Sequence, residues 1–325
     1  MAPAPTMTIR IFSLDLSAGR TEYPSFCALS GCNLSDVSVD LESPSAVANA
    51  LASVDYLPDE RIAQVVFLAN RLSKPILVEG PAGVGKTELA KALSRVTGRA
   101  LIRLQCYEGL DESKALYEWN YKKQLLRIQA DVDHDWDDIE QDIFSEDFLL
   151  TRPLLEAIRA EEPVILLVDE VDRVEVETEA LLLEILSDFQ VSIPELGTIT
   201  ASTQPMVVLT SNNTRELSEA LKRRCLFLHI DYPDPVREQE ILNARVPGLS
   251  DHLAEQIARV ARSIRNLDLK KSPSVSETID WARTLLALSI DDIDETVLGD
   301  TLHVLLKYQA DIEKATKELV SAAGG

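Results

Sequence analysis

A glycine-rich stretch in the first third of the chain restricts the possible fold more than any other feature. Residues 80–87 read GPAGVGKT, which fits the pattern G-x-x-x-x-G-K-[ST]. The stretch follows a short apolar run, PILVEG at 75–80, and precedes a helical pattern, ELAKALSRVTG at 88–98, that ends in glycine. A strand, a glycine loop and a helix in this order form a cradle of backbone N–H groups for phosphate. The sequence therefore predicts a nucleotide-binding α/β domain.

The side chains of this loop suit the phosphates of ATP and a magnesium ion. The glycines let the backbone turn around an anion, Lys86 can reach the β- and γ-phosphates, and the Thr87 hydroxyl can ligate Mg²⁺. We assign the whole loop, the residue after it and one preceding tyrosine to the nucleotide site: Gly80, Pro81, Ala82, Gly83, Val84, Gly85, Lys86, Thr87, Glu88 and Tyr56.

Four more apolar runs predict the remaining strands of a parallel sheet. Helical patterns such as VETEALLLEILSDF at 176–189 lie between them. Strands that alternate with helices are typical of a parallel sheet with right-handed crossovers. The four runs are ALIRLQC at 100–106, PVILLVD at 163–169, PMVVLTS at 205–211 and CLFLHI at 225–230. Together with PILVEG they predict a five-stranded parallel sheet flanked by helices.

The strand pattern stops at about residue 234, and only helical periodicity follows. The segment ETVLGDTLHVLLKYQADIEKATKELV, for example, shows it throughout 295–320. A chain of 325 residues is long enough for about two domains. We therefore expect an N-terminal extension of unassigned role at 1–55, a nucleotide-binding α/β domain at 56–233 and an all-helical domain at 234–325.

Polar side chains follow two of the predicted strands. Asp169 ends the run at 163–169, and a carboxylate at such a strand tip can hold Mg²⁺ through its water shell. The adjacent Glu170 can polarise a water molecule for attack on the γ-phosphorus. The alternative is a solvated acidic turn from Asp169 to Asp172. After the next run, the Asn212 amide can bond the attacking water or the γ-phosphate, or it can serve only as a turn residue.

Three basic residues, Lys222, Arg223 and Arg224, directly precede the last apolar run. A parallel sheet binds its ligand outside the carboxyl ends of its strands, whereas these residues lie at an amino end. We therefore expect Arg223 or Arg224 to contact the γ-phosphate of a neighbouring subunit in a head-to-tail assembly. Arginine suits this role because it offers phosphate a fixed fork of donors. A solvated basic turn is the other interpretation.

Composition limits the classes of partner. The chain has 32 Lys and Arg against 54 Asp and Glu, a net charge of −22, which disfavours general nucleic-acid binding and anionic membranes. MAPAPTMTIR lacks the charged start and apolar core of a signal peptide, and the apolar runs are too short to span a membrane. We expect a cytoplasmic protein with reduced cysteines, which are Cys27, Cys32, Cys106 and Cys225.

The order GPAGVGKT, VILLVDE, VVLTSN, ALKRR and then a helical domain resembles the AAA+ ATPases over about residues 56–325. The closest likeness is to the MoxR family. SEALKRRCLF followed by HIDYPDP is similar to that family's E-A-x-x-D-R-F and Y-P segments. RLQCYEGLDESKALYEWNYKKQLL is similar to the subgroup associated with maturation of carbon monoxide dehydrogenase.

The resemblance implies a role for each motif. It makes 80–87 the Walker A motif, Asp169 and Glu170 the Walker B motif, Asn212 sensor 1 and Arg224 the arginine finger. It further implies ATP and Mg²⁺ as ligands, a helical lid and a homo-oligomer, commonly a hexameric ring. Such proteins act as chaperones that help to insert metals or cofactors into a metalloenzyme client, often beside a partner with a von Willebrand factor A-type domain.

The chain departs from the family pattern at three positions. Asn213 stands where proline is common, and Cys225 stands where phenylalanine is common. Ser274 stands where the arginine of an S-P-R sequence, sensor 2, is usual, so Lys271 or Arg283 would have to replace it.

Two further stretches allow more than one interpretation. The spacing of acidic residues in DVDHDWDDIEQD at 131–142 is similar to that of a calcium loop. However, Trp136 stands where a glycine is needed and Asp142 where a bidentate glutamate is needed, so we predict a solvated acidic segment. Trp119 and Tyr121 either grip a substrate in the pore of a ring or pack against the sheet. For the whole protein, the alternatives to an ATP-driven remodeller are a slow nucleotide switch that organises partners and a DNA-linked ATPase.

Overall fold

The computed structural model describes residues 41–130 and 143–323. The acidic segment at 131–142, Cys27 and Cys32 lie outside the described residues. Cys106 and Cys225 are free thiols, and burial raises the pKa of each to about 12. Within the described parts of the chain, no helix combines the length and the apolar character that a membrane span requires.

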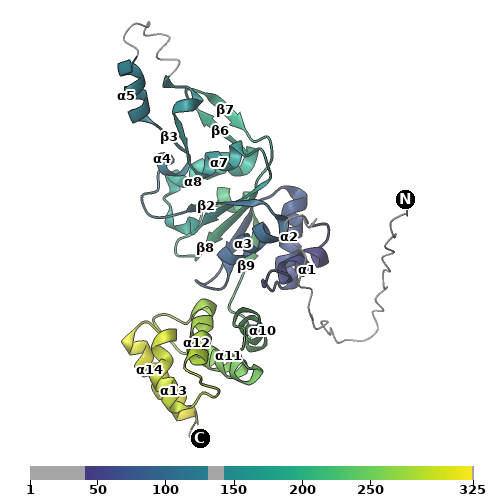
Figure 1. Cartoon of the computed structure of the whole chain (residues 1–325), viewed down its shortest axis with the longest axis vertical. Coiled ribbons are helices and arrows are strands. Elements are labelled where there is room, and N and C mark those ends of the chain that lie inside the picture. Colours follow the sequence, from purple (N-terminus) through teal and green to yellow (C-terminus); the bar gives the residue numbers. More distant parts are fainter. Residues whose placement is uncertain (1–40, 131–142, 324–325) are drawn as a thin grey trace, which may run out of the picture. The chain divides into compact units, whose positions relative to one another are not determined.

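A five-stranded parallel sheet forms the centre of the α/β domain, as predicted (Figure 1). Its strand order is β2-β5-β8-β1-β9, and every neighbouring pair is parallel. All six residues of both β5 and β8 are buried, which explains their continuous apolar sequences. The strands are β1 (Ile76–Glu79), β2 (Ala100–Gln105), β5 (Val164–Asp169), β8 (Met206–Ser211) and β9 (Leu226–His229).

Helices cover both faces of this sheet. Alternate residues of β5 show the division, because Leu166 and Val168 belong to one hydrophobic cluster while Ile165 and Leu167 belong to the other. The first cluster contains α7 (Pro153–Arg159) and α8 (Val176–Asp188). The second contains α1 (Pro44–Ala52), α2 (Glu60–Leu72) and α3 (Lys86–Thr97).

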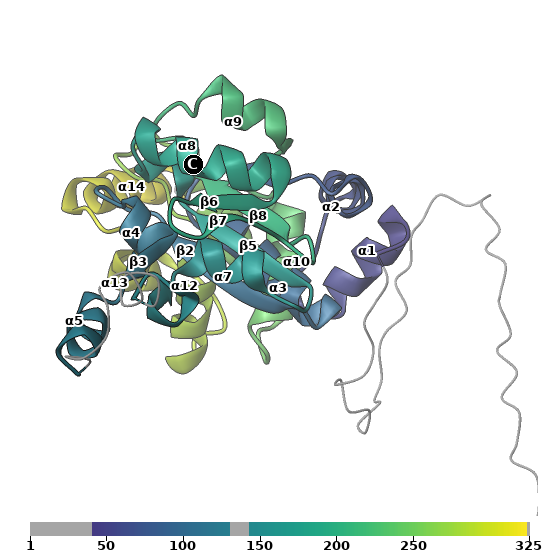
Figure 2. The same cartoon turned by 90° about the horizontal axis from the view of Figure 1, so that it is seen from above.

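Helix α1 lies within the segment 1–55 that the sequence analysis separated from the α/β domain. Val47 and Leu51 of α1 are fully buried in the same cluster as β1, and Figures 1 and 2 show α1 beside α2. Burying such side chains contributes about 1.5–3 kcal/mol each to folding. We therefore propose that the α/β domain begins ahead of α1 rather than at residue 56.

Two antiparallel two-stranded sheets extend the domain, and sequence periodicity predicted neither. One pairs β3 (Tyr117–Trp119) with β4 (Leu149–Thr151), and the other pairs β6 (Gln190–Ile193) with β7 (Gly197–Thr200). Strands of three or four residues are too short to show a period of two. The short helix α4 (Glu112–Ala115) precedes β3, and α5 (Tyr121–Ala130) follows it.

The two aromatic residues with open roles differ in their surroundings. Trp119 is 7% exposed and packs edge to face against Tyr117 and Phe144, so it belongs to the core. Tyr121 is 62% exposed at the start of α5. The structure therefore favours packing for Trp119 and leaves Tyr121 as the exposed residue of the pair.

The C-terminal helices have a hydrophobic cluster of their own. It surrounds the fully buried Trp281, whose Nε1 donates a hydrogen bond to Thr301 Oγ1 at 2.9 Å. The five helices are α10 (Pro235–Arg245), α11 (Asp251–Arg265), α12 (Val275–Ala287), α13 (Glu295–Leu305) and α14 (Gln309–Ala323).

The helical pattern at 295–320 is interrupted, although its periodicity is continuous. Leu306 takes an extended conformation, with φ −111° and ψ 137°, and ends α13. Its side chain is 1% exposed in the cluster around Trp281. Helix α13 therefore ends next to Leu306, which is buried in the core, and α14 begins at Gln309.

Candidate functional site

The loop between β1 and α3 follows a path that requires glycine. Gly80 has φ +154°, and a Cβ atom on it would stand 1.9 Å from the carbonyl oxygen of Ile230, at the end of β9. Gly85 has φ +98° and caps the N-terminus of α3. The loop therefore passes close to neighbouring backbone and directs the positive end of α3 into its concavity.

Lys86 connects this loop to the tip of β8. Its Nζ donates to the carbonyl oxygens of Gly80 at 2.8 Å and Pro81 at 2.6 Å, and to Asn212 Oδ1 at 2.8 Å. Burial lowers the pKa of Lys86, while the charges of Asp172 and other nearby carboxylates oppose that shift. These three oxygens are neutral, so the ammonium charge remains available to a phosphate group.

Asp169 lies at the tip of β5 and receives three donors. Its Oδ1 accepts from Thr87 Oγ1 at 2.9 Å and from Thr210 Oγ1 at 2.6 Å, and its Oδ2 accepts from Arg103 Nη2 at 2.5 Å. Thr87 and Asp169 offer a hydroxyl and a carboxylate side by side, which are hard oxygen ligands of the kind that Mg²⁺ takes from protein alongside water and phosphate. The donor set fits the metal that the sequence analysis assigned to these two residues.

Glu170 occupies an unusual backbone conformation directly after Asp169. Its φ of +58° and ψ of 50° lie in the left-handed region, and its N–H donates to Thr210 Oγ1 at 2.9 Å. The carboxylate Oε2 accepts from Gln105 Nε2 at 3.3 Å and forms an ion pair with Arg173, whose Nε lies 2.8 Å away. Non-glycine residues in this region cost about 1–3 kcal/mol and are concentrated at functional sites. The turn therefore marks Glu170 as a candidate functional residue.

Asp172 is buried, in contrast to the solvated acidic turn considered as an alternative. It is 3% exposed, and its carboxylate accepts from Asn212 N at 3.2 Å, Thr214 N at 2.9 Å and Thr214 Oγ1 at 2.6 Å. Sequence reasoning missed this role, because nothing in the local pattern distinguishes Asp172 from an exposed acid. Asp172 anchors the backbone of Asn212, whose side chain in turn meets Lys86.

These bonds predict a pH-dependent contribution of Asp172 to stability. Burial alone would raise the pKa of Asp172, but the hydrogen bonds from Thr214 and Asn212 outweigh it and lower the pKa. A depressed folded-state pKa stabilises the fold above the unfolded value of about 4, and that stability is lost as pH falls through the folded pKa. Asp172→Asn should therefore lower the free energy of unfolding by about 1–3 kcal/mol at pH 7.

Urea denaturation at several pH values measures this contribution. The difference between wild type and Asp172→Asn should be largest at neutral pH and should shrink below about pH 4. Asp188→Asn, at the exposed end of α8, is the control and should change the free energy by less than about 0.5 kcal/mol. A difference that is independent of pH would contradict a charged, hydrogen-bonded Asp172.

The asparagine after Asn212 explains one departure from the family pattern. Asn213 has φ +56°, in the left-handed region that asparagine tolerates. Proline fixes φ near −65° and cannot adopt this conformation. The turn after β8 in this chain therefore requires a residue other than the proline that is usual there.

The basic residues lie on α9 (Glu219–Arg224), directly before β9. Four strand residues separate them from the end of β9 beside the phosphate loop, a distance of about 13 Å along the strand. Arg224 donates to Ser187 Oγ and to the carbonyl oxygen of Ala220, whereas Arg223 is 80% exposed and lies 3.7 Å from Glu219. Among the residues that the structure describes, Arg224 forms no ion pair, so its charge is not neutralised by a carboxylate.

Ser274, which stands where the resemblance implies a sensor 2 arginine, is part of a helix cap. Its Oγ accepts from Glu277 N at 3.3 Å, and its N–H donates to the Glu277 carboxylate at 2.7 Å, which completes a capping box for α12. The side chain lies against Gly83, because a Cβ on that glycine would stand 2.4 Å from Ser274 Cβ. The two cations that could replace an arginine are paired locally, Lys271 with Glu277 and Arg283 with Asp280.

Tyr56 and Glu88 border the loop as assigned. The ring of Tyr56 lies 3.9 Å from the position of a Cβ on Gly85, and burial raises the pKa of its hydroxyl. Glu88 forms ion pairs with Lys91 at 2.8 Å and Arg245 at 3.7 Å. Burial would raise the pKa of Glu88, but these cations lower it.

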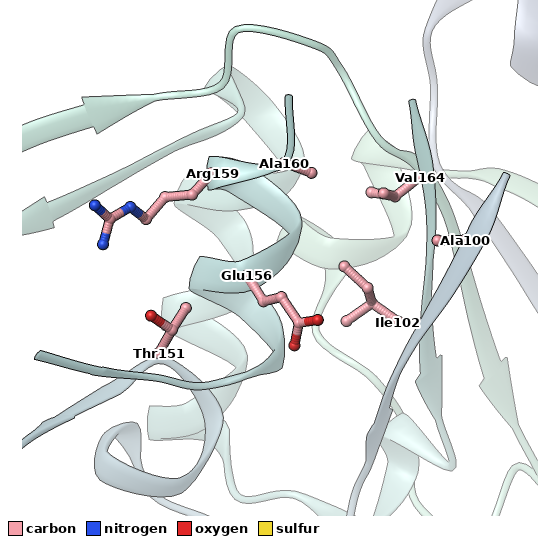
Figure 3. A pocket seen from close by; sticks show the side chains of 7 residues that line it. All are labelled: Ala100, Ile102, Thr151, Glu156, Arg159, Ala160 and Val164. Atoms are coloured by element: carbon pink, nitrogen blue, oxygen red, sulfur yellow. The ribbon is translucent and has the colours of Figure 1, made fainter. Parts of the chain in front are cut away.

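A cavity of about 440 Å³ lies at the other end of the sheet (Figure 3). Ala100 and Val164, at the amino ends of β2 and β5, line it, and Glu156 extends from α7 toward Ile102. The phosphate loop and Asp169 lie at the carboxyl ends of the strands, so this cavity is separate from the candidate nucleotide site.

Comparison with known proteins finds a similar domain in the part of the chain that contains most of the parallel sheet. Residues 75–225 match the family model of the AAA domain (dynein-related subfamily). An uncharacterized protein of Staphylococcus aureus (strain bovine RF122 / ET3-1) is 29% identical over 230 residues, covering 67% of this chain and 77% of its own length. An uncharacterized protein of Staphylococcus haemolyticus (strain JCSC1435) is 28% identical over 238 residues, covering 71% and 82%.

Similar chains also occur among solved structures. The RuvB Holliday junction branch migration motor of Thermotoga maritima is 17% identical, with a TM-score of 0.46, over 81% of this chain and 72% of that one. A point mutant of the same RuvB gives 17% identity and a TM-score of 0.48, over 81% and 73%. The family match and the sheet order, with a phosphate loop after β1 and helices at the C-terminus, confirm the predicted P-loop AAA+ fold.

Proposed function

We propose that this protein is an ATPase that binds ATP with Mg²⁺ at residues 80–87 and hydrolyses it. One observation carries the proposal: hydrogen bonds join the two polar residues of the loop to the tips of two strands. Lys86 bonds Asn212 at 2.8 Å, and Thr87 bonds Asp169 at 2.9 Å. A group bound in the loop would therefore contact a cation, a metal-binding carboxylate and an amide together.

Each residue has a distinct task in the proposed reaction. Lys86 and the backbone N–H groups neutralise the β- and γ-phosphates, and Thr87 and Asp169 hold the metal. Mg²⁺ held there would supply positive charge that polarises the phosphate oxygens. Glu170 orients a water molecule and takes its proton, while Asn212 fixes the water or the γ-phosphate.

The last group comes from another copy of the chain. Arg224, with Arg223 as the alternative, lies too far from its own loop to reach a phosphate bound there. In a head-to-tail ring, hexameric by family resemblance alone, it would stabilise the charge that develops on a neighbour's γ-phosphate. The catalytic site is then complete only in the assembly.

At the level of biology, we propose an ATP-driven chaperone of the MoxR type in the cytoplasm. It would assist maturation or metal insertion in a client metalloenzyme, together with a partner that carries a von Willebrand factor A-type domain. The likeness of the motif segments to that family supports this role. The net charge of −22 continues to disfavour a DNA-linked ATPase, whose turnover DNA would stimulate at low salt.

A slow nucleotide switch is the second candidate, and two features favour it. Ser274 replaces a sensor arginine with a neutral helix cap, and both Asp169 and Glu170 are paired with arginines. Turnover measured with and without the partner distinguishes the two, because a switch turns over slowly in both conditions.

Lys86→Ala tests the ATP site itself. The variant should lose most of its affinity for ATP, because backbone dipoles alone do not balance the phosphate charge. The mutant should remain folded, because the hydrogen bonds that Lys86 Nζ donates within the described residues go to neutral oxygens of the loop and of Asn212. Titration of each protein with a fluorescent ATP analogue measures the affinity.

Lys114→Ala is the matched control for this experiment. Lys114 is a lysine on α4 that pairs with Asp111 at 3.0 Å, outside the loop. Its removal should leave ATP affinity unchanged. Equal affinity in Lys86→Ala and wild type would show that residues 80–87 do not bind the nucleotide.

A further inference from the structure

An arginine from the edge strand of the sheet covers the carboxylate that is proposed to hold the metal. Arg103 on β2 approaches Asp169 Oδ2 with its Nη2 at 2.5 Å. The other carboxylate oxygen already accepts from Thr87 and Thr210. Both oxygens of Asp169 therefore have donors, and the side chain is only 4% exposed.

This pair and a metal ion make competing demands on Asp169. The guanidinium keeps its charge at any physiological pH, so it cannot give way by losing a proton. A cation beside a carboxylate lowers the affinity of that carboxylate for a second cation through direct repulsion. Mg²⁺ with its water shell would need the space and the lone pairs that Arg103 uses. Arg103 has to move before the metal is bound at Asp169.

The position of Arg103 allows that movement. Strand β2 is an edge strand of the sheet, and the Arg103 side chain is 47% exposed. Arg103 Nη2 also donates to Gln105 Oε1, two residues along the same strand. Gln105 in turn donates to Glu170 Oε2 at 3.3 Å. Displacement of Arg103 would thus also disturb a bond to the residue that is proposed to activate water.

We infer that Arg103 is a built-in counter-ion of Asp169, which occupies the place of the metal when nucleotide is absent and is displaced by Mg²⁺ together with ATP. The inference rests on the proposed ATP site. The pair balances the charge of the buried Asp169 carboxylate. It also lowers the apparent affinity for the metal, because only molecules in which Arg103 has left Asp169 can bind the metal there.

Removal of Arg103 should therefore strengthen metal binding. Arg103→Met keeps the aliphatic stem and loses the charge. It should raise the affinity for Mn²⁺, a spectroscopic substitute for Mg²⁺ at oxygen ligands, by about 3- to 30-fold, the range spanned by exposed ion pairs and charge-assisted hydrogen bonds. The measurement is the loss of the free Mn²⁺ electron paramagnetic resonance signal on titration into the complex of the protein with the β,γ-imido analogue of ATP, after removal of free analogue, which itself binds Mn²⁺. Arg103→Lys should give an intermediate affinity.

Arg173→Met is the matched control. Arg173 is 55% exposed and pairs with Glu170 at 2.8 Å, so the variant removes the same charge from the same region without touching Asp169. It should change Mn²⁺ affinity by less than about 2-fold, as expected for an exposed pair. An equal gain in both variants would overturn the inference, because general charge at the site would then explain it.

Two other results would also overturn it. Unchanged or weaker Mn²⁺ binding by Arg103→Met would show that Arg103 does not compete with the metal. Loss of nucleotide binding by Arg103→Met in EDTA would show that Arg103 is a phosphate ligand. Binding of the analogue to wild type is measured first. If wild type does not bind the analogue, the proposed ATP site itself is wrong. A result that fails only in the Arg103 variants contradicts the inference about Arg103 alone.

Discussion

Arg224→Ala should bind ATP with the affinity of the wild-type protein and hydrolyse it about 10³–10⁵-fold more slowly, the range measured for arginines that act in this way. Binding should be retained because Arg224 contacts Ser187 and Ala220 rather than the loop of its own subunit. Hydrolysis should fail because the transition-state charge on the γ-phosphate would lose its external donor. ATP affinity and steady-state turnover, measured on the same preparation, check the two parts.

A mixture of two inactive variants tests whether the site is shared. Lys86→Ala has an intact Arg224, and Arg224→Ala has an intact phosphate loop. In a mixed ring, a subunit with a working loop can receive an arginine from its neighbour, so part of the activity should return. An arginine that acts within its own subunit would leave the mixture inactive, because every subunit would then lack one essential group. No rescue in rings that are shown to exchange subunits would contradict the shared site.

Arg223→Ala is the internal control for the choice of arginine. Arg223 has the same charge, lies on the same helix and is 80% exposed beside Glu219. Its loss should cost less turnover than the loss of Arg224, whose charge no carboxylate balances within the described residues. The reverse order would preserve the shared site and assign the role to Arg223.

Glu170→Gln should retain ATP and Mg²⁺ and lose about 10²–10⁴-fold in hydrolysis, as expected for general-base catalysis. Glutamine has nearly the shape of glutamate, so the left-handed turn at φ +58° and the bond from its N–H to Thr210 should persist. The amide cannot take a proton from water. Single-turnover hydrolysis with preformed protein–ATP complex measures the chemical step separately from binding.

Glu177→Gln is the matched control for this variant, because it removes an exposed carboxylate from the first turn of α8. Its turnover should equal that of wild type. Normal hydrolysis by Glu170→Gln would show that this carboxylate only shapes the turn after β5. If the variant holds ATP as expected, proteins that co-purify with it identify the client and test the proposed chaperone role.

The sequence by itself determined the fold class and the positions of the five strands of the parallel sheet. GPAGVGKT was predicted to lie between a strand and a helix, and it does. The apolar runs at 75–80, 163–169 and 205–211 contain β1, β5 and β8 of the parallel sheet. These features are readable because they are local: strand length, helical period and the loop motif each depend on residues close together in the chain. Strands β3 and β6, with three and four residues, were missed because such short segments carry too weak a local signal.

Only the tertiary structure decided which side chains meet. Asp172 belongs to the same acidic run as Asp169, yet it is buried because the turn after β8, some 40 residues later, supplies its donors. Arg103 pairs with Asp169 across 66 residues because β2 lies next to β5 in the sheet. Strand order places such residues side by side, and sequence spacing does not encode strand order. The components of the candidate site could therefore be predicted from the sequence. The Arg103–Asp169 pair, which we infer competes with the metal, depends on the packing of the sheet.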